Sequence, residues 1–309
     1  MIINTGGRTD TVNYFSDWLI KRFEEGFVYS RNPLFPNTVY KYNLNPEIVD
    51  CVIFCSKNYK PILEKLHKIS DKYNVFCHYT ITAYGKDIEP NVPNLKESVE
   101  TLIKLSQIVG KQRIAWRYDP ILLTTNYTIE KHIQTFEYLA KNISPHIAFC
   151  IFSFVEMYKK LDKNMPEIIP FSDTDKKVIL KALGQISKKY NMKIQTCASG
   201  EEFSQYGIYQ SGCITSEILK KANNIEFKKI AHNGNRKNCK CMPSRDIGAY
   251  DTCLNGCKYC YANKNPDIAY KNFKLHNPNS PLLLGDLKET DTIIEGKQES
   301  FITPQFKLF

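Results

Sequence analysis

Hydrophobic positions along the first two hundred residues follow two alternating patterns. Short apolar runs rich in β-branched and aromatic residues predict strands, and longer stretches with apolar residues three and four positions apart predict helices. The predicted strands lie in MIINTG, VDCVIFCSK, NVFCHYTITAYG, RIAWRYDPILL, HIAFCIFSFVEMY and MKIQTCAS. The predicted helices lie in TVNYFSDWLIKRFEEG, YKPILEKLHKISDKY, LKESVETLIKLSQIVG, TIEKHIQTFEYLAKNI and DTDKKVILKALGQISKKY.

This alternation defines the expected fold class. Strands that alternate with helices of about 10 to 15 residues imply a parallel sheet. No GxGxxG-type loop accompanies them, which favours a barrel over an open nucleotide-binding sheet. We therefore expect an α/β protein in which residues 1–230 form a full or partial TIM-like β/α barrel.

The texture of the chain changes after the predicted barrel. Residues 231–264 are polar, irregular and rich in cysteine, and they contain few apolar residues for a core of their own. Bound metal can supply the folding energy that such a segment lacks. We expect a cluster-binding segment there, followed by a tail, residues 265–309, that wraps over the surface.

Composition indicates the cellular compartment and the kind of partner that we expect for this protein. The N-terminus lacks the features of a signal peptide, and no run approaches the roughly 18 apolar residues of a membrane span. We expect a cytoplasmic protein without a membrane partner, in which 11 cysteines serve better as metal ligands than as disulfides. The formal net charge of +10 is typical of nucleic-acid binding, but the general abundance of lysine explains it equally well.

The stretch TCLNGCKYCYAN contains the most specific pattern in the chain. It places Cys253, Cys257 and Cys260 within eight residues. Zinc sites usually combine two separated pairs of ligands, whereas three thiolates from one loop can hold three irons of a [4Fe–4S] cube and leave the fourth iron open. The spacing, with an aromatic residue before the third cysteine, resembles the radical S-adenosylmethionine (SAM) superfamily, notably spore photoproduct lyase.

This resemblance implies a chemistry and a set of roles. The open iron would bind the amino and carboxylate groups of SAM, and an electron from a donor such as flavodoxin or ferredoxin would yield a 5′-deoxyadenosyl radical. Cys253, Cys257 and Cys260 would be the cluster ligands, and Tyr259 would pack near the adenine. In the superfamily this loop usually follows the first barrel strand, whereas here it follows all of the predicted strands.

The whole chain is also similar to domain-of-unknown-function family 1848, which is found in bacteria and archaea. The similarity rests on RTD, RNP, SKN, WRYDP, SFV and the block CKCMPSRDIGAYDTCLNGCKYCYAN. It supports the barrel and the cluster but supplies no substrate.

The remaining cysteines fall into two sets. Cys197, Cys213, Cys239 and Cys241 lie in or just before the cysteine-rich segment, and we expect them to hold a second [4Fe–4S] cluster or a zinc ion. The alternative is that Cys197 and Cys213 are small buried hydrophobic residues. The other set lies within apolar strand patterns and is predicted to belong to the core: Cys51, Cys55, Cys77 and Cys150.

Polar residues follow several of the predicted strands, where the active sites of barrels collect. Arg117 could pair with the SAM carboxylate, and Asp119 could bond the ribose hydroxyls. Arg8 and Lys57 could receive an anionic substrate, and Asp10 lies beside them. All five of these residues are candidate catalytic residues. The alternative is a structural network of ion pairs that closes the top of the barrel.

The chain ends in QFKLF, which resembles the short peptide by which bacterial repair and replication proteins dock on the sliding clamp. Gln305, Leu308 and Phe309 match that peptide. The alternative is a tail whose last two apolar residues pack on the domain itself.

Two functions are therefore expected, and the position of one cysteine distinguishes between them. The first is a radical-SAM enzyme, a lyase or transferase, that repairs or modifies nucleic acid such as DNA. The second is a nucleic-acid-binding protein whose cysteines hold zinc or a structural cluster. A structural site needs a fourth protein ligand, and Cys241 is the nearest candidate. If Cys241 completes the loop cluster, the enzyme hypothesis fails.

Overall fold

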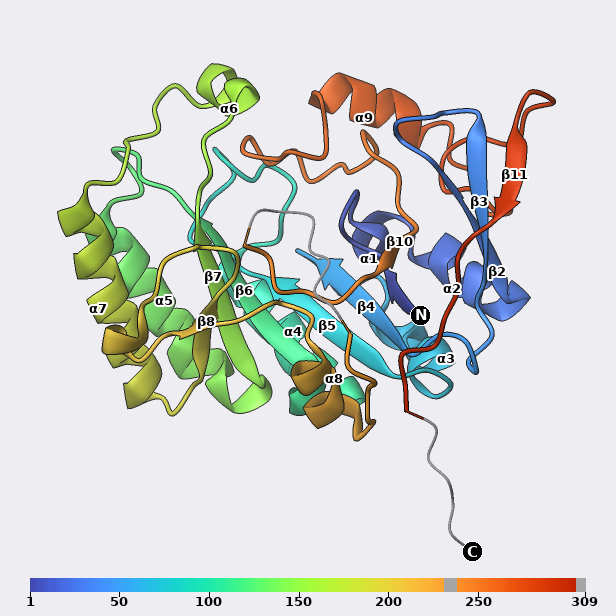
Figure 1. The fold of residues 1–309 in the computed structure, drawn as a ribbon. Helices are drawn as coiled ribbons and strands as arrows, with labels where there is room; N and C mark the ends of the chain where they lie inside the picture. Colours follow the sequence, from blue (N-terminus) through green and yellow to red (C-terminus); the bar gives the residue numbers. More distant parts are fainter. Residues whose placement is uncertain (231–237, 304–309) are drawn as a thin grey trace, which may run out of the picture.

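A sheet of eight parallel strands forms the centre of the computed structural model, which describes residues 1–230 and 238–303 (Figure 1). Across the sheet the strands are β10 (Arg245–Asp246), β1 (Ile2–Asn4), β4 (Cys51–Ser56), β5 (Val75–Thr80), β6 (Ile114–Ile121), β7 (Phe149–Phe154), β8 (Ile194–Thr196) and β9 (Tyr209–Gln210). The six strands predicted from the pattern are all present.

The strand order bears on the predicted fold class. From β1 to β9 the strands of this sheet follow one another in space as they do in sequence, and every pair is parallel. Within the described residues, the edge strands β9 and β10 do not pair with each other. The expectation of a parallel α/β sheet is confirmed, and closure of the sheet into a barrel is not shown.

Amphipathic helices cover one face of the sheet. The main ones are α2 (Ser16–Glu25), α4 (Leu95–Val109), α5 (Ile129–Ile143) and α7 (Asp173–Lys189). Side-chain caps from Asn94, Thr128 and Ser172 begin the last three, as helix starts require. Alternate strand residues point into this layer, and Trp116 of β6 stacks on Phe136 of α5.

The helix predicted in YKPILEKLHKISDKY is wrong in extent. That stretch forms only the short turn η1 (Leu63–Lys65) and the single turn α3 (His67–Ser70). Its apolar residues Ile62, Leu66 and Ile69 are nevertheless buried, so the spacing identified a buried face correctly. The other short helices of the structure include α1 (Thr11–Tyr14), α6 (Lys159–Asn164), α8 (Ser216–Asn223) and α9 (Pro266–Phe273).

The opposite face of the sheet carries a smaller core. Cys51, Phe76 and Ile151 point to this side, and Leu219 of α8 and Met242 pack against the same cluster. Figure 1 shows α8 lying in front of the sheet, whereas α6 and α9 lie beyond its upper end. Both faces of the parallel sheet are therefore covered, as such sheets require.

A second sheet joins the two ends of the sequence. It contains β2 (Phe27–Arg31), β3 (Thr38–Asn43) and β11 (Thr292–Glu295), and β11 runs parallel to β3. The predicted tail thus packs on the N-terminal hairpin, and its Ser300 hydroxyl donates a hydrogen bond to Asp50, which also binds the N-terminal amine of Met1. The strand pattern had not indicated either the hairpin or β11.

Two further expectations concern the membrane and the end of the chain. Among the described residues, no helix is long and apolar enough to cross a membrane. The predicted clamp-binding residues Gln305, Leu308 and Phe309 lie outside the described residues.

Candidate metal centres at the carboxyl ends of the strands

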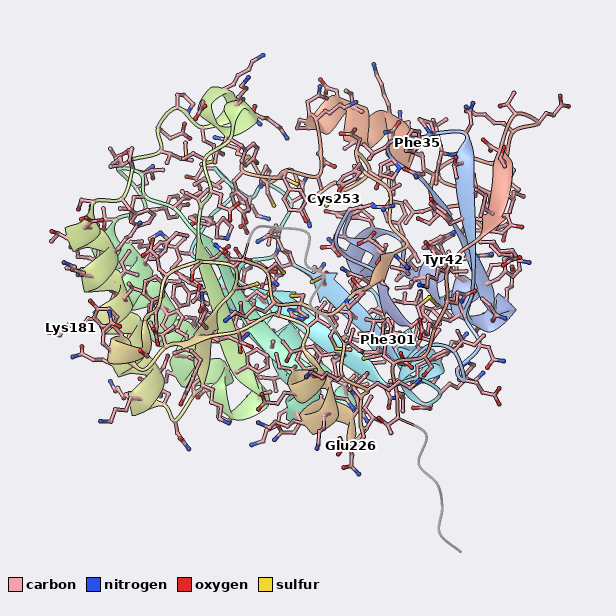
Figure 2. All side chains as sticks on the ribbon, in the orientation of Figure 1. Phe35, Tyr42, Lys181, Glu226, Cys253 and Phe301 are labelled. Carbon is pink, nitrogen blue, oxygen red and sulfur yellow. The ribbon has the colours of Figure 1, made fainter. Side chains whose placement is uncertain are left out.

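The cysteine loop follows β10 and packs against the carboxyl end of β1. Figure 2 shows Cys253 between α9 and the central sheet. The Asn255 amide donates a hydrogen bond to Asp10 at 3.0 Å and accepts one from the Tyr14 hydroxyl at 3.0 Å. The Thr252 hydroxyl donates to Thr9 at 2.9 Å. Residues about 240 positions apart in the sequence are therefore held together by side-chain hydrogen bonds.

Asp10 is the buried anchor of this contact. Besides Asn255, its carboxylate accepts hydrogen bonds from the Ser56 hydroxyl at 2.7 Å and from the Lys57 backbone N–H at 3.0 Å. Burial raises the pKa of Asp10, whereas these hydrogen bonds stabilise its ionised form. The sequence placed Asp10 among the catalytic candidates, and the structure places it where it holds β1, β4 and the cysteine loop together.

Glu89 is a second buried anchor, and the sequence analysis missed it. Its carboxylate accepts hydrogen bonds from Lys57 at 2.9 Å, from Thr82 at 2.7 Å and from the Tyr259 hydroxyl. The Lys57 ammonium also lies 5.6 Å from the centre of the Tyr259 ring. Burial, followed by the Glu89 charge, raises the pKa of Tyr259 well above its usual value. An acidic residue shortly after a predicted strand was the available signal.

A third set of contacts fixes the far side of the loop. The Lys160 ammonium of α6 donates to the backbone carbonyl oxygens of Cys260, at 2.7 Å, and Asn263. The Tyr158 hydroxyl donates to the Tyr259 carbonyl at 2.6 Å. A pocket of about 190 Å³ lies between α6 and the loop and is lined in part by Cys257. It is smaller than the roughly 300 to 1,000 Å³ of typical small-molecule sites.

The donor set of the loop fits an iron–sulfur cube. Cys253 is buried, Cys257 and Cys260 are partly exposed, and the Ala262 backbone N–H donates to the Cys260 sulfur at 3.3 Å. N–H groups directed at cysteine sulfurs are one of the means by which proteins tune such clusters. The three sulfurs are not gathered within 4.8 Å of one another. A cube does not require sulfurs that close, because each cysteine binds a different iron.

A second group of cysteines is gathered more tightly. The sulfurs of Cys197, Cys213 and Cys241 all lie within 4.8 Å of one another, and this group could hold a metal ion. The Cys213 backbone N–H donates to the Cys241 sulfur at 3.2 Å. Cys239, the fourth residue predicted for this site, is not in the group. Of the predicted core cysteines, Cys51, Cys77 and Cys150 are fully buried and Cys55 is partly exposed.

Arg117 and Asp119 lie at the end of β6, near this second group. They form an ion pair with each other, and the Ser153 hydroxyl donates to Asp119. Arg117 also interacts electrostatically with Cys213 and Cys55. His78, on the neighbouring strand β5, is 1% exposed, and burial followed by the Arg117 charge lowers its pKa well below the usual value. A neutral imidazole therefore lies close to the Arg117 guanidinium.

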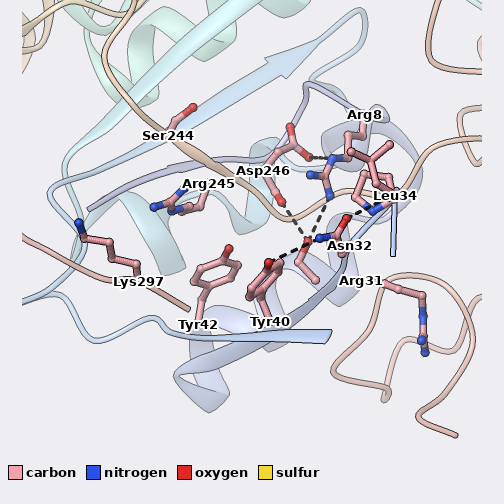
Figure 3. A pocket seen from close by; sticks show the side chains of 12 residues that line it. Arg8, Arg31, Asn32, Leu34, Tyr40, Tyr42, Ser244, Arg245, Asp246 and Lys297 are labelled. Carbon is pink, nitrogen blue, oxygen red and sulfur yellow. Dashed lines mark hydrogen bonds and ion pairs between the residues drawn. The ribbon is translucent and has the colours of Figure 1, made fainter. Parts of the chain in front are cut away.

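Arg8 lines a pocket that Asp10, Lys57, Arg117 and Asp119 do not line. A pocket of about 460 Å³ lies between β10 and the β2–β3 hairpin, and Figure 3 shows Arg8 together with Tyr42, Arg245 and Lys297 around it. The Arg8 guanidinium is 4.0 Å from the carboxylate of Asp246. This pocket combines aromatic rings with an excess of positively charged side chains. A ligand with both a ring and a negative charge could pack on the rings and pair with the cations.

Glycines allow β1, β4 and β10 to approach one another at this site. The Gly7 backbone N–H donates to Asp246 at 2.7 Å, and a Cβ on Gly7 would lie 2.4 Å from that carboxylate. A Cβ on Gly6 would lie 2.3 Å from the Cβ of Cys55. Both positions therefore exclude a side chain, which explains the Gly-Gly pair immediately after β1.

Comparison with known proteins gives one match. Residues 2–262 match a family model described as a domain of unknown function, DUF1848. No curated protein matches the chain, and no solved structure does. The matched range includes both groups of cysteines and ends two residues after Cys260.

Proposed function

The chain belongs to the DUF1848 family, and we propose that it is an iron–sulfur enzyme of the radical-SAM type. Cys253, Cys257 and Cys260 hold a [4Fe–4S] cluster whose open iron takes SAM. When bound, such a cluster would supply the electron that divides SAM into methionine and a 5′-deoxyadenosyl radical. The remaining residues of the site position the loop, bind the two substrates and exclude water.

The observation that carries this proposal is the place of the loop in the sheet. The loop follows β10, which pairs with β1 at the edge of a sheet whose other strands run in sequence order. β10 is thus first in space although it is last in sequence. The cluster loop of the superfamily that this motif resembles usually follows the first barrel strand. The loop therefore lies at the first-strand end of the sheet, as is usual in that superfamily, although it comes late in the sequence. The same strand order favours a partial barrel over a doubly wound sheet.

The location of Cys241 supports the same proposal. A structural cluster in the loop would need a fourth protein ligand, and Cys241 was the nearest candidate in sequence. Its sulfur lies instead with those of Cys197 and Cys213. The loop itself supplies three thiols, which is the number that keeps one iron of a cube open to an outside ligand.

The proposed roles of the other residues follow from their surroundings. Tyr259 lies against the adenine side of SAM, and Glu89 fixes its hydroxyl. Arg117 pairs with the carboxylate of SAM, and Asp119 accepts hydrogen bonds from its ribose hydroxyls. These contacts replace part of the ion pair that Arg117 and Asp119 form with each other. Asp10 and Lys57 act as positioning residues, because both already bond within the protein.

We place a nucleic-acid substrate, DNA first, on the side of the pocket that contains Arg8. The net charge of +10 supports a polyanion, and Tyr40 and Tyr42 offer ring faces beside Arg245. A flavodoxin or ferredoxin in the cytoplasm supplies the electron, and the end of the chain docks on a sliding clamp. The second candidate, a nucleic-acid-binding protein fastened by metal, is favoured by the tight group of Cys197, Cys213 and Cys241.

The test uses the full chain purified and reconstituted without oxygen. We would measure iron and sulfide, record the EPR spectrum of the reduced protein with and without SAM, and assay 5′-deoxyadenosine under a strong reductant. We expect a [4Fe–4S]⁺ signal that SAM shifts, together with 5′-deoxyadenosine release.

Two variants make this test decisive. Cys257→Ala should lose the signal and the product, whereas Cys77→Ala, which removes a buried core thiol, should retain both. A cluster that does not respond to SAM, or a loop that binds zinc in place of iron, would contradict the enzyme and leave the binding protein.

A further inference from the structure

Three cysteines from separate segments meet at the open edge of the main sheet. Cys197 follows β8, Cys213 follows β9, and Cys241 precedes β10. Within the described residues none of the three forms a disulfide, and their sulfurs lie within 4.8 Å of one another. Cys197 and Cys213 are buried, at 3% and 6% exposure.

The spacing of the sulfurs is compatible with ligands that share a single metal ion. Sulfurs that bind one tetrahedral zinc ion at about 2.3 Å lie about 3.8 Å apart. The group meets this requirement within the 4.8 Å limit. The ligands of an iron–sulfur cube bind different irons, so their sulfurs lie farther apart than on a single ion. The all-sulfur donor set is the one that zinc prefers in structural sites.

The surrounding backbone is shaped to hold the group. The Cys213 N–H donates to the Cys241 sulfur at 3.2 Å, and the Met242 N–H donates to the Ile214 carbonyl at 2.8 Å. A Cβ on Gly212 would lie 2.6 Å from the Lys240 carbonyl oxygen, so only glycine allows the two segments to approach this closely. The thiolates of a filled site would carry negative charge, and the Arg117 guanidinium lies near enough to Cys213 to offset it.

The position of the group indicates what the metal does. β9 and β10 are two-residue strands, and they form the two edges of the sheet without pairing with each other in the described residues. Residues 240–242, which include Cys241, bond to the segment after β9 just before the chain enters β10. The group therefore connects the two edges at a place where few backbone hydrogen bonds do so.

We propose that Cys197, Cys213 and Cys241 bind a single zinc ion whose fourth coordination position takes a water molecule, and that the ion joins the β9 edge of the sheet to the segment leading into β10. The ion displaces the thiol protons and contributes binding energy that the short strands lack. It takes no part in the radical chemistry, so this site stands whether or not the loop cluster binds SAM.

Metal analysis of the full chain, purified without oxygen, tests the proposal. We expect one zinc ion per chain in addition to the iron of the loop. Cys213→Ser should lose the zinc and keep the iron. A variant with alanine at positions 253, 257 and 260 should keep the zinc and lose the iron. Cys150→Ser is the matched control, because it changes a buried thiol outside both groups and should keep both metals.

A second measurement on the unaltered chain covers the case in which Cys213→Ser fails to fold. Hydrogen exchange is followed before and after a chelator removes the zinc. Amide protection should fall in residues 209–214 and 238–246 and remain in β4 and β5. Iron at the tight group, zinc that survives Cys213→Ser, or a uniform change in protection would each overturn the proposal.

Discussion

The two groups of cysteines use the same side chain in opposite ways. The loop cysteines 253, 257 and 260 come from one short segment, and their sulfurs are not gathered within 4.8 Å. Hydrogen bonds that the loop donates to Asp10 and Glu89, and one that it accepts from Lys160, hold it in place. The cysteines at 197, 213 and 241 come from three segments, and their sulfurs do lie within 4.8 Å. The first group depends on the fold for its position, whereas a metal at the second would help to determine the fold.

The comparison teaches that cysteines close together in sequence need not have the closest sulfurs in space. A pattern dense in sequence produced the open arrangement, and a pattern dispersed in sequence produced the tight one. Local density of cysteine is therefore a guide to where a loop can hold a cluster. It does not indicate which thiols will share a single ion.

The largest expected effect comes from removing the anchor of the loop. Asp10→Ala leaves the buried Asn255 amide and the Lys57 backbone N–H without their acceptor. Each unpaired buried donor costs about 1 to 3 kcal/mol, so we expect a loss of about 3 to 5 kcal/mol in the free energy of unfolding. Iron content should fall and zinc content should not. Urea unfolding and metal analysis check both.

Asp17→Asn is the matched control for Asp10→Ala. It changes an exposed carboxylate whose partner is Lys65, and surface pairs contribute little to stability. It should leave both metals and the unfolding midpoint unchanged. Equal loss of iron and zinc in Asp10→Ala would show that the two groups are not held independently.

Acidification gives a somewhat smaller effect and sets the range in which the groups can be compared. The fully buried His132 donates to the Leu122 carbonyl and accepts from the Tyr118 hydroxyl, and burial lowers its pKa to about 4. The unfolded chain binds this proton near pH 6.5, so stability is full above that value and falls as the pH decreases toward 4. We expect His132 to contribute a loss of about 3 kcal/mol over that interval.

His132→Gln isolates this contribution, because glutamine can keep both hydrogen bonds without titrating in this range. Urea unfolding of the two proteins at several pH values should show a steeper loss in the unaltered chain below pH 6.5. Parallel pH profiles would contradict the role of His132. Above pH 6.5 this effect of His132 is absent, so a loss of iron or zinc there reflects a change at the site that binds that metal.

The smallest expected effect distinguishes the two tyrosines that flank Cys260. Tyr259→Phe removes a buried hydrogen bond to Glu89 and should cost about 1 kcal/mol in the free energy of unfolding. Tyr261→Phe removes a bond to the Gly7 carbonyl from a side chain that is largely exposed, and it should cost less. Both variants should keep iron and zinc. An equal loss of stability would show that Glu89 does not hold the loop.

The sequence predicted much of the fold because the buried strands are continuous apolar runs. All six of those strands are present, and three of the long helices have the predicted extent to within a few residues. The short strands β9 and β10 escaped prediction, because two residues show no period. The pattern also overextended the helix near Ile62, where apolar spacing continues through a chain that makes only single turns.

The candidate site was predictable in its residue types and less so in its pairings. Cysteine spacing identified the loop, and strand ends identified Arg117, Asp119 and Lys57. Sequence offered no measure of which thiols would meet, so Cys239 was included with Cys241 although only the latter joins the tight group. Glu89 was missed because its role depends on contacts with Lys57 and Tyr259, which are distant in sequence.

The pairing of β10 with β1 also determines when the loop site can form during synthesis. The ribosome completes β1 at its beginning and β10 only some 240 residues later, at a few residues per second. The carboxyl end of β1, with Asp10 already in place, must wait for Asn255 to emerge. If the loop holds the proposed cluster, iron and sulfide can therefore be inserted only after residues 253–260 have been synthesised.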